Sequence, residues 1–536
     1  MLRTGRSARA FFTFVLLVSL QSFAASAKKA APKKPLATQI DAILIQPQLA
    51  RAHWGVAVVE LGSGKELYSL NQDQLFLPAS NAKLFTTAAA LAIAGPDYRF
   101  HTTVEAYGKT DNEGRLDGDL VIMGRGDPNI SGRVMPYLLK TERLPPHTQV
   151  LEELADQVAH SGLKVVSGDI VGDDTFYSPQ RYAEGWAHDD LQWIDGAPIS
   201  ALTFNDNVVF LNIQPGEHAG DKAVVTFEPN IHYYELDNRI LTAAPGVARK
   251  IGVHREMGSK TIALWGSLPV GDVGAKEALA IEDPAEFVAG LFRSMLEQRG
   301  ITVTGKTRAR HSDIAQFFDQ PAAQAPPAGT GADPEQHPSL KDVLQVPTPG
   351  IRAEHISLPF LEDVRVTNKT SQNLHAELAL RLIGKLAGSG GSLEGGGAVL
   401  KQFLLQAGLK DDEFVLLDGS GLSRRDLVTP GAVVRLLLYA ARQPWGAAFA
   451  DTLPVSGVDG SLSERFLNTP ATGLIHAKTG TLSHVNALSG YGQTKSGKRF
   501  VFSILCNNHK LTSGKAQAAM DSIVQLLVSQ DDPVKR

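Results

Sequence analysis

The sequence predicts a mixed α and β fold in which a mainly β region interrupts a domain of strong helices and strands. Two stretches, roughly residues 38–98 and 340–536, alternate helical runs with strand-like runs. Between them, residues 99–315 contain many short β-rich pieces broken by Gly and Asp, which is typical of inserted β domains, and we expect two. The chain has 536 residues, 43% hydrophobic and 20% charged, so several packed cores are expected.

The first 27 residues have the layout of a secretory signal peptide. A basic start with Arg3, Arg6 and Arg9 precedes an apolar run over residues 11–20, and Ala25-Ser26-Ala27 is a small-residue cleavage site. That run is too short to cross a bilayer, and no later stretch is long and apolar enough. We therefore expect cleavage after about Ala27 and an exported protein without a transmembrane segment.

Local signals place the elements along the chain. Residues 28–37, rich in Lys, Ala and Pro, indicate a flexible lead-in, and residues 316–339, rich in Pro, Ala, Gly and Gln, indicate a linker or surface loop. Periodicity and turn residues predict a hairpin of strands 54–61 and 65–70, a helix over 81–94, short strands at 120–123, 165–166 and 208–213, a helix over 283–299, helices over 374–386 and 396–407, strands at 474–482, 488–493 and 499–507, and a last helix over 515–530. The apolar stripe of the last helix is expected on the sheet, with a weak peripheral association with a membrane as the alternative.

Charge and cysteine content exclude several functions. The formal net charge is −4, and loss of the three leader arginines makes it more negative, which does not favour binding to nucleic acid. The single cysteine, Cys506, lies in an apolar run, so we expect a buried strand residue and no intrachain disulfide. The scattered histidines have no metal-ligand spacing, and we expect neither a metal nor another cofactor.

A serine and a lysine begin the predicted helix over 81–94, in the pattern Ser80-Asn81-Ala82-Lys83. Positions i and i+3 share one face of a helix, so the Lys83 amine comes within reach of the Ser80 hydroxyl. A serine needs a base to act as a nucleophile, and lysine serves when desolvation or a nearby cation keeps its amine neutral. Taken alone, a helix cap with a solvated lysine explains the pattern better.

A second pattern, Ser371-Gln372-Asn373, directly precedes a predicted helix. From such a loop the Ser371 hydroxyl can relay a proton between Lys83 and a leaving amine, and the Asn373 amide can hold a substrate amide. Taken alone, an N-cap explains this pattern better.

A third pattern, Lys478-Thr479-Gly480-Thr481, lies on a predicted strand. Lys478 supplies positive charge, and Thr479 and Thr481 can donate hydrogen bonds to a carboxylate. The backbone N–H groups of Thr481 and Ser80 form an expected oxyanion hole. Alone, the segment fits an exposed strand end.

Together the patterns follow the order Ser-x-x-Lys, Ser-x-Asn, Lys-Thr-Gly, which is the motif set of penicillin-binding proteins and class A β-lactamases. Over the whole mature chain the sequence resembles the class C low-molecular-mass penicillin-binding proteins, the D-alanyl-D-alanine carboxypeptidase/endopeptidases of the penicillin-binding protein 4 type. Residues 168–174, 417–424 and 453–460 also carry the resemblance. The long separation of Lys83 from Ser371 fits, because that family has extra domains there.

The resemblance implies a discontinuous catalytic domain of the penicillin-recognising, β-lactamase-like type: a five-stranded antiparallel sheet with helices on both faces. Its active site lies between the strand of Lys478 and the helix that starts at Ser80. The implied reaction is hydrolysis of D-Ala-D-Ala termini, of D-Ala–diamino-acid cross-links in peptidoglycan, or of both. The expected partners are stem peptides and β-lactam antibiotics, which acylate the enzyme, and the expected compartment is the periplasm.

The resemblance also implies roles for matching residues. Ser80 attacks the carbonyl of the penultimate D-Ala, Lys83 is the general base, and Ser371 is the proton relay. Lys478 anchors the terminal carboxylate.

Other residues are expected around the rest of the substrate. The resemblance implies that Arg424, together with Asp173 or Asp174, holds the diamino-acid end of the stem peptide. Asp418 is expected to shape its loop. Gln372 stands where related families often have Asp, but no chemistry is assigned to it.

Two alternatives stay open. A serine β-lactamase shares the acylation step, but the chain has no Glu-x-x-Leu-Asn segment of the kind that activates the deacylating water in class A enzymes. A catalytically silent peptidoglycan-binding homologue would keep the fold, although all the expected catalytic residues are present. The balance between carboxypeptidase and endopeptidase activity is left open.

Overall fold

The computed structural model describes residues 35–137, 145–317, 350–388 and 390–530. The predicted signal peptide, residues 1–27, lies outside these residues, as do most of the predicted lead-in and most of the predicted linker. None of the helices in the described ranges has both the length and the apolar character needed to cross a membrane.

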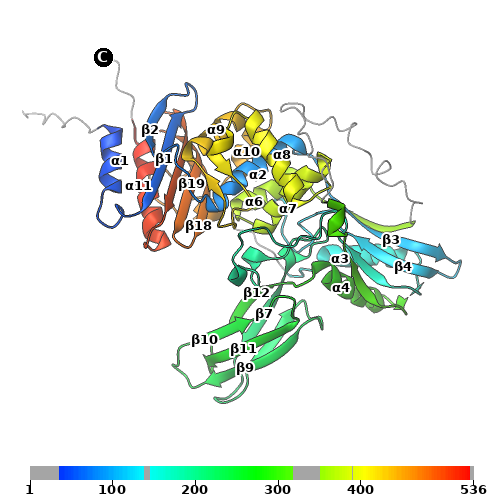
Figure 1. Ribbon diagram of the computed structural model, residues 1–536. Coiled ribbons are helices and arrows are strands. Elements are labelled where there is room, and N and C mark those ends of the chain that lie inside the picture. The colour runs from blue at the N-terminus through cyan, green and yellow to red at the C-terminus, as the bar shows by residue number, and fades with distance from the viewer. Residues whose placement is uncertain (1–34, 138–144, 318–349, 389, 531–536) are drawn as a thin grey trace, which may run out of the picture. The chain divides into compact units, whose positions relative to one another are not determined.

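Five strands of the described chain form one antiparallel sheet in the order β18-β19-β20-β1-β2. Strands β1 (His53–Glu60) and β2 (Glu66–Leu70) are the predicted hairpin, and β18 (Ile475–Leu482), β19 (Val485–Gln493) and β20 (Arg499–Asn507) are the predicted C-terminal strands. Because β20 pairs with β1, segments from opposite ends of the sequence share this sheet (Figure 1).

Helices cover both faces of the sheet, because successive strand side chains point to opposite sides. Val56 and Ile504 pack with α1 (Leu36–Leu44) and α11 (Ser513–Val528) on one face. Ala57 and Leu505 face the other way, into a core shared with α2 (Ala82–Ile93), α7 (Asn373–Leu386), α8 (Leu393–Gln406) and α9 (Pro430–Ala440). This is the predicted arrangement, although helix α1 was not predicted.

The inserted region forms three further sheets in the part of the chain that the structure describes. The largest has the order β13-β5-β4-β3-β15, with β6 beside β4 and β14 beside β6, and two three-stranded sheets have the orders β10-β11-β9 and β12-β7-β8. The strands are β3 (His101–Thr110), β4 (Arg115–Met123), β5 (Val165–Val166), β6 (Ile170–Asp173), β7 (Val208–Gln214), β8 (Val224–Glu228), β9 (Glu235–Ala243), β10 (Lys250–His254), β11 (Thr261–Pro269), β12 (Ala275–Ala280), β13 (Thr302–Val303), β14 (Thr307–Arg310) and β15 (Gly350–Ile356).

Two helices share the core of the inserted region. Helix α4 (Pro284–Gln298) was predicted, and Asp283 caps it by accepting a hydrogen bond from the backbone of Glu286. Helix α3 (Gln149–His160) was not predicted; it buries Leu151 and Leu154 beside strand residues such as Val104.

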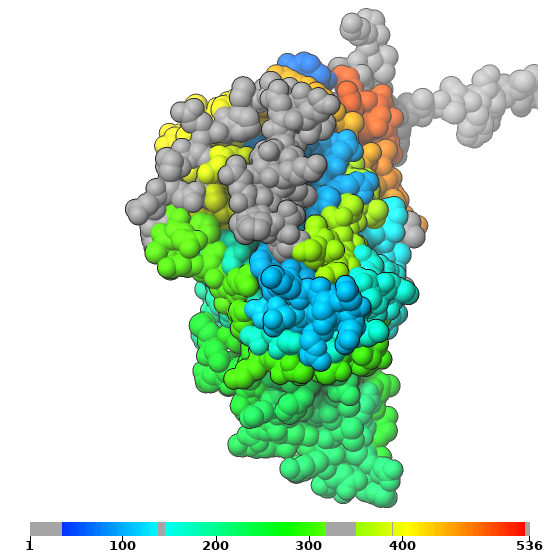
Figure 2. Space-filling view, turned by 90° about the vertical axis from the view of Figure 1, so that its right-hand side faces the viewer, coloured from blue at the N-terminus to red at the C-terminus, as the bar shows by residue number. Residues whose placement is uncertain are grey.

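The chain leaves the inserted region through its largest sheet. Strand β15 pairs antiparallel with β3 before the chain enters α6 (Phe360–Lys369), and Figure 2 shows these yellow-green residues against the blue ones. The remaining elements are β16 (Phe414–Val415), β17 (Leu427–Val428) and α10 (Gly446–Thr452). Helices α6 and α7 therefore carry the Ser371 loop between them, next to the inserted strands.

Candidate active site

Ser80 lies in a short 3-10 turn, η1 (Ala79–Asn81), that leads directly into α2. The edge strand β18 lies against this turn, and Asn81 Nδ2 donates to the carbonyl of Lys478 at 3.1 Å. Gly480 permits the approach, because a Cβ at that position would come 2.8 Å from the Pro78 carbonyl oxygen. The first and third sequence patterns are thus adjacent.

The Lys83 side chain is fully buried and its Nζ reaches three oxygens. These are Ser80 Oγ at 3.0 Å, Asn373 Oδ1 at 2.6 Å and the Ser420 carbonyl at 2.7 Å. Burial lowers the pKa of Lys83 to about 8, against the opposing effect of nearby carboxylates. A neutral amine has two N–H groups and one lone pair, so it can donate to Asn373 and Ser420 while accepting the Ser80 proton.

Lys478 is also fully buried, and its Nζ donates to Ser371 Oγ at 2.8 Å and to the Thr479 carbonyl at 3.0 Å. Burial and, secondly, the charge of Lys83 hold the pKa of Lys478 well below its usual value. Ser371 itself has a left-handed backbone, with φ of 65°. The second pattern therefore lies between the two lysines: Ser371 is hydrogen-bonded to Lys478, and Asn373 is hydrogen-bonded to Lys83.

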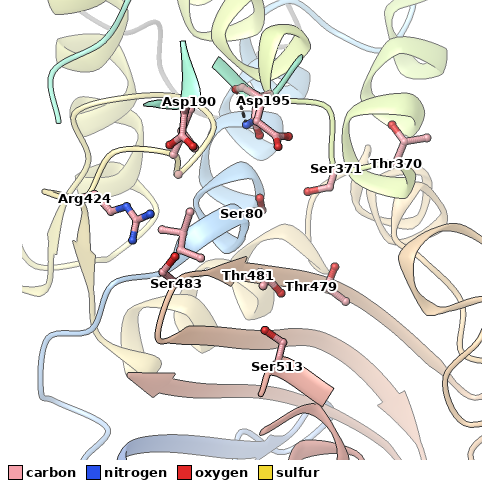
Figure 3. Close-up of a pocket in the computed structure, with 15 residues that line it drawn as sticks. Ser80, Asp190, Asp195, Thr370, Ser371, Arg424, Thr479, Thr481, Ser483 and Ser513 are labelled. Carbon is pink, nitrogen blue, oxygen red and sulfur yellow. Dashed lines mark hydrogen bonds between the residues drawn. The ribbon is translucent and has the colours of Figure 1, made fainter. Parts of the chain in front are cut away.

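A cavity of about 570 Å³ opens over these groups. Ser80 lies between a wall that contains Thr479 and Thr481 of β18 and an opposite wall that contains Asp190 and Asp195 (Figure 3). Ser371, Asn373 and Arg424 also line the cavity. Lys478 is absent from the lining residues, and its Nζ lies beneath the cavity on Ser371 Oγ.

The loop over residues 417–424 is shaped by Asp418, as the sequence predicted. Its carboxylate accepts hydrogen bonds from the backbone N–H groups of Gly421 at 2.6 Å and Ser423 at 2.8 Å, and from the indole of Trp186 at 2.8 Å. Gly421 has a φ of 79°, and a Cβ there would meet the Ala79 carbonyl. The loop thus packs on the Ser80 turn and brings Arg424 to the cavity.

Comparison with known proteins identifies the family. Residues 36–317 and 345–530 match the model of the D-Ala-D-Ala carboxypeptidase 3 (S13) family. The chain belongs to this family. A D-alanyl-D-alanine carboxypeptidase of Actinomadura sp. (strain R39) is 34% identical over 506 residues, which cover 92% of this chain and 84% of that protein. The D-alanyl-D-alanine carboxypeptidase DacB of Haemophilus influenzae is 24% identical over 478 residues, 88% of each chain.

The S13 fold is confirmed at the level of structure. The crystal structure of penicillin binding protein 4 (dacB) from Haemophilus influenzae superposes with a TM-score of 0.73 at 21% identity, and the match covers 91% of this chain and 98% of that chain. The predicted resemblance and the predicted fold class, a five-stranded antiparallel sheet with helices and additional β domains, are therefore correct.

In this S13 member, Asp173 and Asp174 do not reach the cavity. Asp173 accepts from Thr175 Oγ1 at 2.6 Å and pairs with Arg310 at 3.1 Å. Asp174 accepts from Ser200 Oγ at 2.9 Å and pairs with His311 at 2.8 Å. Their oxygens are used to join strands of the inserted region, because Gly-Asp-Asp ends β6 beside β14.

The sequence analysis did not find the acidic residues that do line the cavity. Asp190 ends the short turn η2 (His188–Asp190), and Asp195 lies in η3 (Ile194–Gly196). The Asp195 carbonyl accepts from Asn373 Nδ2 at 2.9 Å, while neither carboxylate accepts a hydrogen bond from a described residue. Burial raises the pKa of Asp190, and the nearby charge of Asp189 raises it further. No motif distinguishes these carboxylates from solvated ones in the sequence.

Glu377 is a further group that sequence reasoning missed. It lies in α7 with no exposed surface and accepts hydrogen bonds from the backbone N–H groups of Gly419 and Ser420, each at 2.9 Å. Burial and the charge of Asp418 raise the pKa of Glu377 to about 7. The charge of Glu377 raises the pKa of Lys83 and so opposes the effect of burial on that amine.

Proposed function

We propose that this protein is a periplasmic serine peptidase that removes the terminal D-Ala from peptidoglycan stem peptides through an acyl-enzyme on Ser80. The observation that carries the proposal is the surroundings of the Lys83 amine. Two fixed acceptors, Asn373 Oδ1 and the Ser420 carbonyl, engage its Nζ, and Ser80 Oγ is the third contact at 3.0 Å, so that the neutral form of the amine has its lone pair left for the Ser80 proton. Family membership supports the same activity.

Acylation follows from this geometry. Ser80 Oγ attacks the carbonyl carbon of the penultimate D-Ala and gives its proton to the Lys83 amine as the C–O bond forms. The backbone N–H groups of Ser80 and Thr481 stabilise the resulting oxyanion. A proton then passes through Ser371 to the leaving amine, the C–N bond breaks, and D-Ala departs. Water releases the acyl group by the reverse path, again with Lys83 as base.

The terminal carboxylate of the substrate belongs on the β18 wall. Thr479 and Thr481 line the cavity there, and the buried Lys478 provides positive charge directly behind Ser371. This position brings the preceding peptide bond over Ser80, which is the condition for attack of Oγ on its carbonyl carbon.

The opposite end of the cavity fits the zwitterionic end of a diamino acid. Arg424 provides a cation for its carboxylate, and Asp190 provides an anion for its ammonium group. Asp190 takes the part that the sequence analysis gave to Asp173 or Asp174. Because a cross-linked stem peptide presents the same bond, D-Ala–diamino-acid cross-links are proposed as a second substrate.

Labelled penicillin tests the nucleophile. The wild-type protein is expected to carry one covalent adduct, and Ser80→Ala to carry none. Ser392→Ala is the matched control, since Ser392 also begins a helix, α8, where it only caps Gly395 at 2.9 Å. An unchanged adduct on Ser80→Ala would refute the assignment, and rapid turnover of the penicillin would identify a β-lactamase instead.

Purified muropeptides separate the two peptidase activities. Release of free D-Ala from uncross-linked pentapeptides identifies a carboxypeptidase, and conversion of dimers to monomers identifies an endopeptidase. If the protein forms the penicillin adduct but cleaves neither substrate, the proposed function is wrong.

A further inference from the structure

The loop that carries Ser371 needs support from outside its own helices. Ser371 has φ of 65°, a region that is sterically unfavourable for residues with a side chain beyond Cα. Before it, Lys369 at the end of α6 forms a buried ion pair with Asp459. After it, the support comes from the Gln372 side chain, which has 8% of its surface exposed.

Gln372 joins the catalytic domain to the inserted region. Its Oε1 caps α7 by accepting from the Leu374 backbone at 2.9 Å, and its Nε2 donates to Asp206 Oδ2 at 2.7 Å. Asp206 lies in η4 (Asn205–Asn207), between the largest inserted sheet and β7. Asp206, a residue of the inserted region, therefore contacts Gln372, which lies between Ser371 and Asn373.

The turn that holds Asp206 is itself unusual. Asn205, Asp206 and Asn207 all have left-handed backbones, with φ of 49°, 58° and 55°. Asn207 fixes the turn by accepting from the Phe204 backbone at 2.9 Å and donating to the Pro198 carbonyl at 2.8 Å. Three successive residues in this region are rare, and such strain persists where the surrounding structure enforces it. The turn directs the Asp206 carboxylate toward Gln372 and His375.

Asp206 is the centre of a buried charge network. Its oxygens accept from Arg133 Nη2 at 2.7 Å and face His375 Nε2 at 3.0 Å, and His375 Nδ1 faces Asp363 at 2.6 Å. Burial opposes the charged form of His375, but these two carboxylates outweigh it and raise the pKa of His375. With both ring nitrogens directed at carboxylates, His375 donates twice and is an imidazolium. Arg133 and His375 thus both face Asp206 beside the Gln372 contact.

We propose that Asp206 is a positioning residue for the reaction at Ser80: through Gln372 and His375 it holds the turn that presents Ser371 and Asn373 to the two lysines. The consequences are direct, because Ser371 Oγ lies 2.8 Å from Lys478 Nζ and Asn373 Oδ1 lies 2.6 Å from Lys83 Nζ. Displacement of this turn misplaces the proton relay and removes one of the acceptors that aim the Lys83 lone pair. This inference rests on the proposed function.

The first test is Asp206→Asn, assayed by the rate constant of acylation with a labelled penicillin and by kcat and KM on a D-Ala-D-Ala peptide. A misplacement of catalytic groups by about 1 Å slows chemistry on the order of 100-fold. We expect a loss of that size in acylation and kcat, with KM within about threefold of wild type, because the groups proposed to bind the two ends of the substrate, Thr479 and Thr481 at one end and Arg424 and Asp190 at the other, lie outside the displaced turn.

A second variant isolates the loop contact if Asp206→Asn folds poorly. Gln372→Asn retains a good helix cap but withdraws the amide from Asp206 by one methylene, and about a 10-fold loss in acylation is expected. The double variant Asp206→Asn/Gln372→Glu reverses donor and acceptor while it preserves the net charge. It is expected to acylate at least about tenfold faster than Asp206→Asn.

Glu282→Gln is the matched control, because Glu282 pairs at 2.9 Å with buried Arg255 in the inserted region, away from the Ser371 loop. It is expected to lower the melting temperature without slowing acylation. The inference is overturned if folded Asp206→Asn acylates at the wild-type rate, or if the double variant recovers nothing. A wild-type protein that forms no adduct would instead refute the proposed function.

Discussion

Two lysines lie side by side beneath the cavity, and their surroundings differ. Lys83 and Lys478 are both fully buried, and each has its Nζ within hydrogen-bonding distance of a serine hydroxyl, Ser80 at 3.0 Å and Ser371 at 2.8 Å. The charges around Lys83 are the carboxylates of Asp418, Glu377 and Asp195, and its pKa is lowered only to about 8. Lys478 has no such carboxylate among the causes of its shift, and its pKa falls well below the usual value.

One buried site thus contains two amines of the same kind that differ in how strongly they hold a proton. Desolvation disfavours the charge on both, and the nearby carboxylates decide which amine keeps its proton in the empty site. A substrate carboxylate near Lys478 favours the charged form of that lysine, and a charged Lys478 in turn favours neutral Lys83. In the proposed mechanism, Lys83 then accepts the Ser80 proton when substrate is bound.

The largest expected effect comes from removing the amine that faces Ser80. Lys83→Met should slow acylation by penicillin by about 10³- to 10⁴-fold, the upper range for loss of a general base. The melting temperature should fall as well, because Asn373 Oδ1 and the Ser420 carbonyl lose their buried donor, so the rate is measured at a temperature at which the variant is folded. Stopped-flow or gel detection of the labelled adduct measures the rate. A Lys83→Met protein that acylates normally would contradict the assignment of the base.

Removal of the other amine should have a smaller and substrate-dependent effect. Lys478→Met is expected to reduce kcat/KM about 100-fold for peptides with a free terminal carboxylate, because a charge-assisted contact and a support of Ser371 are lost. A C-terminally amidated peptide, already a poor substrate, should lose much less. If both peptides lose activity equally, Lys478 acts only through Ser371 and the anchoring role is wrong.

The pH dependence of acylation reports the Lys83 amine directly. Lys83 accepts a proton only when neutral, so the rate should rise with pH and level off above about 8, the pKa to which burial lowers this amine. The acylation rate constant, measured from pH 6 to 10 with an uncharged leaving group, gives the inflection. A rate that falls with pH across this range would mean that the charged amine is the active form.

The sequence predicts the parts of this site that are local and fails where partners are distant. Ser80 and Lys83 are one helical turn apart, and Lys478 to Thr481 follow one strand, so each pattern fixes its own geometry. The sheet strands were also predictable, because their alternating side chains separate two apolar cores.

The contacts of the acidic residues could not be predicted from the sequence. Asp173 and Asp190 both lie in ordinary-looking acidic turns, and their roles depend on partners remote in sequence, Arg310 for the first and the open cavity for the second. Asp206 has the same character, since only folding brings it to Gln372. The sequence does not predict helix α1, because the helix is short and begins within a Lys/Ala/Pro-rich stretch whose composition indicates a flexible segment.

The last variant has the mildest consequence, because it changes one charge near Lys83 and leaves both lysines in place. Asp195 raises the pKa of Lys83, so Asp195→Asn should lower that pKa and move the acylation inflection to lower pH, by about half a unit for an exposed carboxylate. Asp190→Asn is the matched control: it lies on the same cavity wall but is absent from the charges that act on Lys83, so the inflection should stay fixed while KM for a stem peptide with a free side-chain amine rises. Equal shifts in both variants would mean that the field of the whole cavity, and no particular carboxylate, sets the difference between the two amines.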